Sequence, residues 1–160
     1  MLFLTVGSQK FQFNRLLRAV DELVDCGKIT DEVFAQIGYS DYEPQHYYFQ
    51  KFLDRDEFAN VMNKAAVVIT HGGTGAIIGA VKKGKKVIAV PRRAKYGEHV
   101  DDHQLQLVSQ FRDLNLICEC DDCNQLGDIL DKISGITFNH YQSNTKIIID
   151  SIEKFMEENM

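Results

Sequence analysis

Short apolar runs alternate along the chain with longer segments in which apolar residues recur every three or four positions. The runs are rich in Val, Ile, Leu and Phe, as buried strands are, and they cover residues 2–6, 32–37, 67–70, 86–90 and 116–118. The periodic segments predict amphipathic helices, the last of them a terminal helix over residues 142–158. Strands that alternate with helices predict an α/β fold built on a doubly wound parallel sheet with right-handed crossovers.

The apolar run at 67–70 breaks into a glycine-rich loop, His71-Gly-Gly-Thr-Gly75, and a helical segment begins near Thr74. Glycine permits a sharp turn and lets a ligand approach the backbone closely. The free N–H groups and the positive end of the helix dipole favour a phosphate or diphosphate at this point. We therefore expect an anion to bind here, with a purely steric use of glycine in a strand-to-helix loop as the alternative.

Polar loops follow several of the predicted strands, at Gly7–Lys10, His71–Gly75 and Arg92–His103. The carboxyl ends of parallel strands meet at one edge of an open sheet, and ligands bind in the crevice there. These loops therefore predict a single nucleotide-binding site at that edge.

Length and composition place the chain among ordinary globular proteins. Its 160 residues predict a single domain over residues 1–160, and no stretch approaches the roughly 20 apolar residues of a membrane span. The start of the chain runs directly into a strand pattern without a basic segment, so we expect no signal peptide and a cytoplasmic protein. A net charge of -5 argues against a general nucleic-acid binder.

Three features could suggest a metal, and we expect none to bind one. The cysteines of Cys118-Glu-Cys-Asp-Asp-Cys123 lack an evident fourth ligand for zinc. The Asp-x-Asp pattern at Asp54 fits a capping box with Glu57 at the start of a helix better than a divalent-cation site. His99 and His103 lie four positions apart, and we expect them to cap a helix or line a pocket.

Several motifs occur along the chain in an order that is typical of one known protein family. The motifs are Thr5-Val-Gly-Ser8, Phe13-Asn-Arg-Leu16, His71-Gly-Gly-Thr-Gly75, Val90-Pro-Arg92 and Glu98-His-Val-Asp-Asp-His-Gln104. Together they resemble the donor-binding half of GT-B glycosyltransferases, of the family 28 C-terminal type. The chain is similar to the separate short subunits of two-component transferases in capsule and exopolysaccharide synthesis. It is also similar to the catalytic subunit that adds the second N-acetylglucosamine to a dolichol-linked sugar.

The resemblance implies the Rossmann-like C-terminal half of a GT-B enzyme, which binds a UDP-sugar. It implies that the diphosphate and the donor sugar lie against His71, Gly72, Gly73, Thr74 and Gly75 and against the segment from Glu98 to Gln104, which contains His103. It also implies that the first turn, Gly7 and Ser8, lies at the cleft. Many relatives carry a ribose-binding glutamate where this chain has Gly79, so ribose recognition and the identity of base and sugar stay open.

Sugar transfer requires stabilisation of the leaving UDP and removal of a proton from the acceptor hydroxyl. We expect loop amides, the helix dipole and a side chain such as Arg92, Arg93 or His103 to stabilise the diphosphate, without a metal or another cofactor. The resemblance implies inversion of configuration with a carboxylate or imidazole as general base. Glu98 and His99 are the candidates on this chain, and a residue on the acceptor half is the alternative.

The resemblance further implies a membrane-attached subunit that supplies the acceptor half. We therefore expect a hexosyltransferase subunit, recruited to the cytoplasmic face of a membrane, that transfers sugar to a lipid-linked saccharide only with this partner. A non-catalytic nucleotide-sugar-binding subunit is the alternative. An NAD-dependent oxidoreductase is disfavoured, because Gly72-Gly-Thr-Gly75 lacks the Gly-x-Gly-x-x-Gly register and the next strand ends at Pro91 rather than at an acidic ribose ligand.

Overall fold

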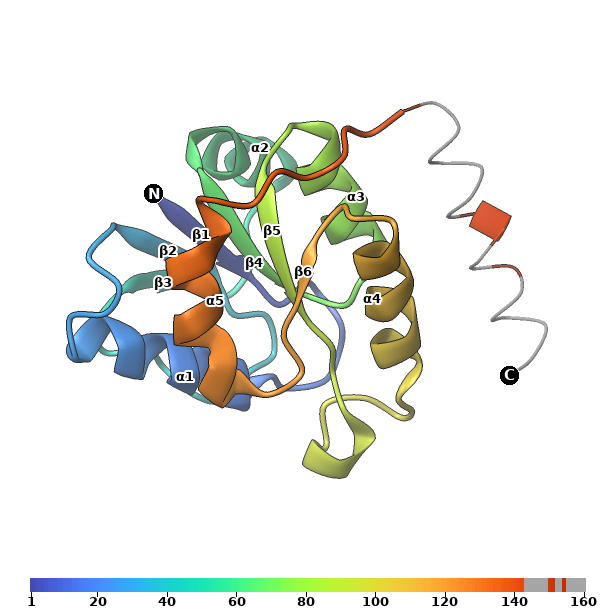
Figure 1. Ribbon diagram of the computed structural model, residues 1–160. Coiled ribbons are helices and arrows are strands. Elements are labelled where there is room, and N and C mark those ends of the chain that lie inside the picture. Colours follow the sequence, from blue (N-terminus) through green and yellow to red (C-terminus); the bar gives the residue numbers. More distant parts are fainter. Residues whose placement is uncertain (143–149, 152–153, 155–160) are drawn as a thin grey trace.

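Figure 1 shows the computed structural model, which describes residues 1–142, 150–151 and 154. Within these residues, six parallel strands form one sheet in the order β3-β2-β1-β4-β5-β6. The strands are β1 (Leu2–Thr5), β2 (Val33–Gln36), β3 (Tyr48–Gln50), β4 (Val67–His71), β5 (Lys86–Val90) and β6 (Cys118–Glu119). The helices are α1 (Asn14–Asp25), α2 (Arg55–Lys64), α3 (Thr74–Lys82), α4 (His103–Asp113) and α5 (Leu126–Ile133), with the short 3-10 helices η1 (Ala94–Tyr96) and η2 (Cys123–Gln125). The predicted doubly wound parallel sheet is confirmed.

Helices cover both faces of the sheet (Figure 1). Helices α1 and α5 pack on one face, and α2, α3 and α4 pack on the other. Successive residues of a strand point to opposite faces, so Val87 and Ala89 of β5 enter one core while Ile88 and Val90 enter the other. This two-sided burial is why the central strands read as continuous apolar runs.

The predicted beginning of α2 is confirmed. Asp54 caps α2 by accepting a hydrogen bond from the Glu57 backbone N–H at 2.8 Å, as the capping-box pattern predicted. Gly84 ends the turn after α3 with a φ of 71°, a conformation that glycine adopts without strain. The terminal helix predicted for residues 142–158 lies largely outside the described residues. Among the residues that are described, no helix is long and apolar enough to cross a membrane.

The order of the strands defines where a ligand can enter. β1 leads through α1 to β2 on one side of it, whereas β4 leads through α3 to β5 on the opposite side. β1 and β4 are neighbours, paired from Leu2 with Val67 to Thr5 with Thr70. Their carboxyl ends therefore diverge into loops on the two sides of a crevice, which is the position of ligand sites in doubly wound sheets.

Candidate functional site

A cavity of about 580 Å³ opens at the carboxyl ends of β1 and β4. Its walls are Gly7, Ser8 and Gln9 after β1, and His71 with the beginning of α3 after β4. Residues 52–55, which connect β3 to α2, complete it. The structure thus brings together the first turn and the glycine loop, which lie more than 60 residues apart in the sequence.

The beginning of α3 is open to this cavity. Gly73 is the N-cap residue and no side chain caps the helix, while Thr74, Gly75 and Ala76 of the first turn line the cavity. The N–H groups of a first helical turn have no partners within the helix, and the helix dipole is positive at this end. The site therefore offers backbone donors to an anion.

Several glycines around the loop make room for neighbouring side chains. A Cβ on Gly7, which has a φ of 74°, would lie 2.5 Å from His71 Nε2, and one on Gly73 would lie 2.2 Å from His71 Cε1. A Cβ on Gly72 would lie 2.8 Å from Gln104 Cβ. Only Gly75 among these has open space around that position, with no atom within 4 Å. The steric alternative therefore applies to Gly7, Gly72 and Gly73, and ligand binding at the loop stays a prediction.

His71 ends β4 with its ring enclosed between Gly7 and Gly73. The residue is 5 % exposed, and Gln104 Nε2 lies 3.4 Å from its Nδ1. Burial, together with the positive charge of Arg92 and the nearby His99, lowers the pKa of His71 to about 3. The imidazole is therefore neutral at physiological pH.

Gln104 lies in the first turn of α4, beneath the glycine loop. Its Oε1 accepts hydrogen bonds from the backbone N–H groups of Gly72 and Arg92, each at 3.0 Å. The side chain thereby ties the loop after β4 to the loop after β5. Gln104 is 7 % exposed, so it supports the predicted donor site from behind instead of lining the cavity.

Arg92 is completely buried, unlike the exposed cation expected for a diphosphate. Its Nη2 donates to the carbonyl of Val6 at 2.6 Å, and its Nη1 donates to the carbonyls of Phe11 at 3.0 Å, Gln12 at 3.2 Å and Glu98 at 3.1 Å. Burial lowers the pKa of Arg92 to about 10, although Glu98 acts in the opposite direction. Through these hydrogen bonds the guanidinium connects the segment after β1 to the loop after β5.

Glu98 has an environment that argues against the expected general-base role. It is fully buried, and its carboxylate accepts hydrogen bonds from Arg15 Nε, Arg15 Nη2 and the Arg93 backbone N–H, each at 3.0 Å. Neither Glu98 nor Arg15 lines the cavity at the glycine loop. A carboxylate held in this way anchors the loop after β5.

His99 precedes α4 and His103 is its first residue, and neither lines the cavity. The His99 ring packs against Phe11 with centroids 5.4 Å apart, and its Nδ1 lies 3.3 Å from Asp101 Oδ1. The His103 backbone N–H donates to Asp101 Oδ1 at 3.0 Å. Within the described residues, no group of three His, Cys, Asp or Glu side chains is arranged to hold a metal ion.

One wall of the cavity was not predicted from the sequence. Phe52 is 45 % exposed and its ring contacts that of Tyr39 edge to face, with centroids 5.1 Å apart. Gln36 Oε1 fixes the same segment by accepting the Leu53 backbone N–H at 2.9 Å. Arg55 adds a cation to this wall. The missing signal was β3 itself, a three-residue strand without an apolar run, so the segment after it was not recognised as a strand-end loop.

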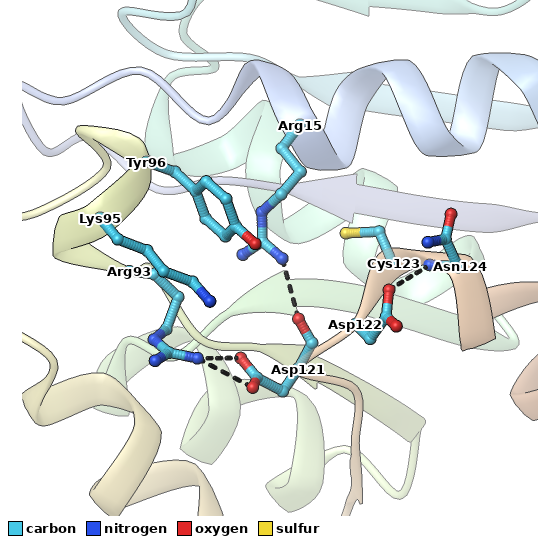
Figure 2. A pocket seen from close by; sticks show the side chains of 8 residues that line it. All are labelled: Arg15, Arg93, Lys95, Tyr96, Asp121, Asp122, Cys123 and Asn124. Carbon is cyan, nitrogen blue, oxygen red and sulfur yellow. Dashed lines mark hydrogen bonds and ion pairs between the residues drawn. The ribbon is translucent and has the colours of Figure 1, made fainter.

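A second hollow of about 490 Å³ lies over the ends of β5 and β6, and Figure 2 shows the side chains that line it. Arg93 Nη1 contacts both carboxylate oxygens of Asp121 at 2.9 Å, and Arg15 Nη1 donates to the Asp121 carbonyl at 2.8 Å. The Arg15 guanidinium also lies 4.6 Å from the centre of the Tyr96 ring. Both arginines are therefore already engaged with the protein.

Solved structures with a similar fold include several glycosyltransferases. MurG of Acinetobacter baumannii superposes with a TM-score of 0.60 and 18 % identity, over 95 % of this chain and 49 % of that one. CalG4, the calicheamicin glycosyltransferase, superposes with a TM-score of 0.59 and 16 % identity, over 83 % of this chain and 34 % of that one. SnogD from Streptomyces nogalater superposes with a TM-score of 0.59 and 15 % identity, over 82 % of this chain and 34 % of that one. The chain thus spans a third to a half of the length of these structures, and at such low identity the likeness shows the fold.

Comparison with the sequences of curated proteins gives no match. The family model for the glycosyltransferase family 28 C-terminal domain, in contrast, matches residues 1–158, nearly the whole chain. The sheet order, the cavity at the carboxyl ends of β1 and β4 and this match agree with one another. The chain belongs to the glycosyltransferase family 28 C-terminal domain family and has the fold of the donor-binding half of a GT-B glycosyltransferase.

Proposed function

We propose that this chain binds a UDP-sugar in the cavity at the glycine loop. The observation that carries the proposal is the uncapped first turn of α3, which opens with Gly7 and Ser8 into one cavity of about 580 Å³. A nucleoside diphosphate fits a site of this kind because backbone N–H groups and the helix dipole stabilise its negative charge. The glycosyltransferase VinC, whose fold is similar with a TM-score of 0.53 and 17 % identity, was crystallised with dTDP.

The proposed orientation follows from the chemistry of the walls. The diphosphate lies against Thr74 and Gly75 at the beginning of α3, where its charge is best stabilised. The base lies toward the exposed ring of Phe52, which offers an aromatic face for stacking. In this position the α3 amides stabilise the leaving diphosphate as the glycosidic bond breaks, without a metal.

We further propose that the chain is one subunit of a hexosyltransferase that works with inversion of configuration. Its partner is a membrane-associated subunit that binds a lipid-linked saccharide, and the pathway is polysaccharide or glycan synthesis at the cytoplasmic face of a membrane. The family match supports this proposal, since the matched domain is the C-terminal domain of a glycosyltransferase family. A donor half needs an acceptor half to position the second substrate.

A second candidate is a nucleotide-sugar-binding subunit that does not itself supply the catalytic base. Glu98 is buried and bound to Arg15, and Asp54, the carboxylate that lines the cavity, caps α2. His99 is then the candidate base that remains from the sequence analysis, and it lies outside the lining of the cavity. These observations favour a base on the partner subunit.

Two measurements test the proposal. Calorimetry with UDP, dTDP and NAD should give binding of UDP and no binding of NAD. Transfer from radiolabelled UDP-sugars to membrane acceptor lipids should then be measured with this chain alone, the partner alone and both together. We expect transfer only from the pair. Efficient transfer by this chain alone would refute the split enzyme, and full activity of the partner alone would favour the accessory role.

A further inference from the structure

The orientation of the Gln104 amide is determined by its neighbours. One atom of the amide lies 3.0 Å from both the Gly72 and the Arg92 backbone nitrogens. Both of these nitrogens carry a hydrogen and can only donate, so the atom between them must be the amide oxygen. The other atom, 3.4 Å from His71 Nδ1, is therefore the amide nitrogen, which can only donate.

This orientation also determines the tautomer of His71. Because Gln104 Nε2 donates, His71 Nδ1 must be the acceptor, and the ring proton of the neutral imidazole then lies on Nε2. The charged or titratable groups that act on the ring are Arg92 and His99, and both disfavour the imidazolium. The facing groups thus supply no negative charge that would hold a second proton on the ring.

The protonated nitrogen faces the proposed diphosphate site. His71 Nε2 is the nearest atom to a Cβ built on Gly7, at 2.5 Å, and it lies 2.7 Å from one built on Gly73. Gly7, Gly73 and His71 all line the cavity of about 580 Å³. Within residues 1–142, 150–151 and 154, no protein atom forms a hydrogen bond with Nε2. The N–H is therefore available to a ligand.

We propose that Gln104 is a positioning residue that holds His71 in its Nε2–H tautomer, so that a neutral imidazole donates a hydrogen bond to the diphosphate of the bound nucleotide. This inference rests on the proposed function. It explains why a glutamine is buried beneath the glycine loop: one side chain fixes the loop through its oxygen and fixes the imidazole through its nitrogen.

Gln104→Glu is the decisive variant, because it preserves the shape and keeps an acceptor for both backbone N–H groups. Its second oxygen accepts where the amide nitrogen donated, so the neutral His71 must place its proton on Nδ1 and turn a lone pair toward the diphosphate. Protonation of the ring restores the donor on Nε2. We therefore expect UDP affinity of the variant to fall about tenfold or more between about pH 6 and about pH 9, whereas the native affinity stays nearly constant.

Controls separate this effect from structural damage. Uridine, which lacks the diphosphate, should bind the native protein and the variant equally well. The double variant Gln104→Glu with His71→Gln should lose the steep pH dependence, because a glutamine amide keeps a donor near the position of Nε2 and does not titrate in this range. Equal weakening of uridine and UDP at every pH would overturn the proposal in favour of a merely structural role.

Nitrogen NMR of His71 in the native protein tests the tautomer without a nucleotide or a variant. We expect a protonated Nε2 and an unprotonated Nδ1 from about pH 6 to about pH 9. A protonated Nδ1 would overturn the role of Gln104, whatever the nucleotide affinity. The protein could instead show the expected tautomer and bind no UDP. That result would overturn the nucleotide site and the hydrogen bond from His71 to the diphosphate. The role of Gln104 in setting the tautomer of His71 would still stand.

Discussion

The guanidinium of Arg15 on α1 holds the carboxylate of Glu98 through two hydrogen bonds of 3.0 Å, from Nε to Oε2 and from Nη2 to Oε1. The side chain of Glu98 is 1 % exposed and that of Arg15 is 19 % exposed. The pair joins the first helix of the chain to the loop after β5. This loop carries Arg92 and leads to Gln104, so its position determines how the proposed donor site is supported.

Removal of Arg15 should therefore destabilise the protein. Arg15→Ala leaves the buried Glu98 carboxylate with the Arg93 N–H as its remaining partner, and we expect a loss of about 2–3 kcal/mol in the free energy of unfolding. Unfolding in denaturant measures this loss of stability. Arg112→Ala is the matched control, because the Arg112 side chain is 52 % exposed and its ion pair with Glu119 should contribute much less. Equal losses from both variants would contradict a special role of the Arg15–Glu98 pair.

Gly73→Ala should weaken UDP binding by displacing His71. The added Cβ would lie 2.2 Å from His71 Cε1, so the imidazole must move and its proposed hydrogen bond with the diphosphate should be lost. We expect UDP affinity to fall about tenfold or more in calorimetry. This reason differs from the one suggested by the sequence, which was the close approach of a ligand to the glycine backbone.

Gly79→Ala is the control for this experiment. Gly79 lies inside α3, and its Cβ would meet no atom within 4 Å, so alanine should raise stability by about 0.5–1 kcal/mol. Undiminished UDP binding by the Gly73 variant, beside a normal Gly79 variant, would show that His71 and its loop do not form the site.

Local patterns were sufficient for most of the fold. The apolar runs predicted β1, β2, β4 and β5, because both faces of these strands are largely buried and most of their residues are apolar. β3 gave no such signal, since it lies at the edge of the sheet with Tyr48 74 % exposed. Its absence from the prediction also concealed Phe52, which follows it in the cavity wall.

The functions of charged residues were harder to predict than the strands. Arg92 follows a strand directly, as ligand-binding residues often do, and the sequence gives no sign that its side chain turns inward. Its partners are the carbonyls of Val6, Phe11 and Gln12, which come from a turn about 80 residues earlier. Glu98 likewise meets Arg15 only in the folded chain. Such convergence depends on tertiary structure and has no local signature.

The cysteines at positions 118–123 should hold no structural zinc. Burial raises the pKa of the Cys120 thiol to about 12 and that of Cys123 to about 11, so both remain protonated at neutral pH, whereas zinc binds thiolates. We expect elemental analysis of the purified protein to give no stoichiometric zinc. A thiol reagent should modify the exposed Cys26 first and the buried Cys120 last. One tightly held zinc per chain would contradict this prediction.

Asp21 should make the stability of the protein sensitive to acid. Its carboxylate accepts hydrogen bonds from the Tyr42 hydroxyl at 2.6 Å and from the backbone N–H groups of Gln45 at 2.9 Å and His46 at 2.8 Å. Burial alone would raise the pKa of Asp21, but these hydrogen bonds outweigh it and hold the pKa below its ordinary value of 3.8. The charged carboxylate thus fastens the segment before β3 to α1.

The lowered pKa of Asp21 determines how the stability of the protein changes with pH. A carboxylate whose pKa is lower in the folded than in the unfolded state stabilises the protein fully above the unfolded value, and the contribution is lost as the pH falls through the folded value. Asp21→Asn should therefore cost about 1–2 kcal/mol at neutral pH, and the difference from the native protein should shrink below about pH 4. Asp113→Asn, at a side chain that is 63 % exposed, should not alter the pH profile in this way. Urea unfolding from about pH 7 to about pH 3 gives the three profiles, and a constant offset for the Asp21 variant would show that its charge contributes nothing.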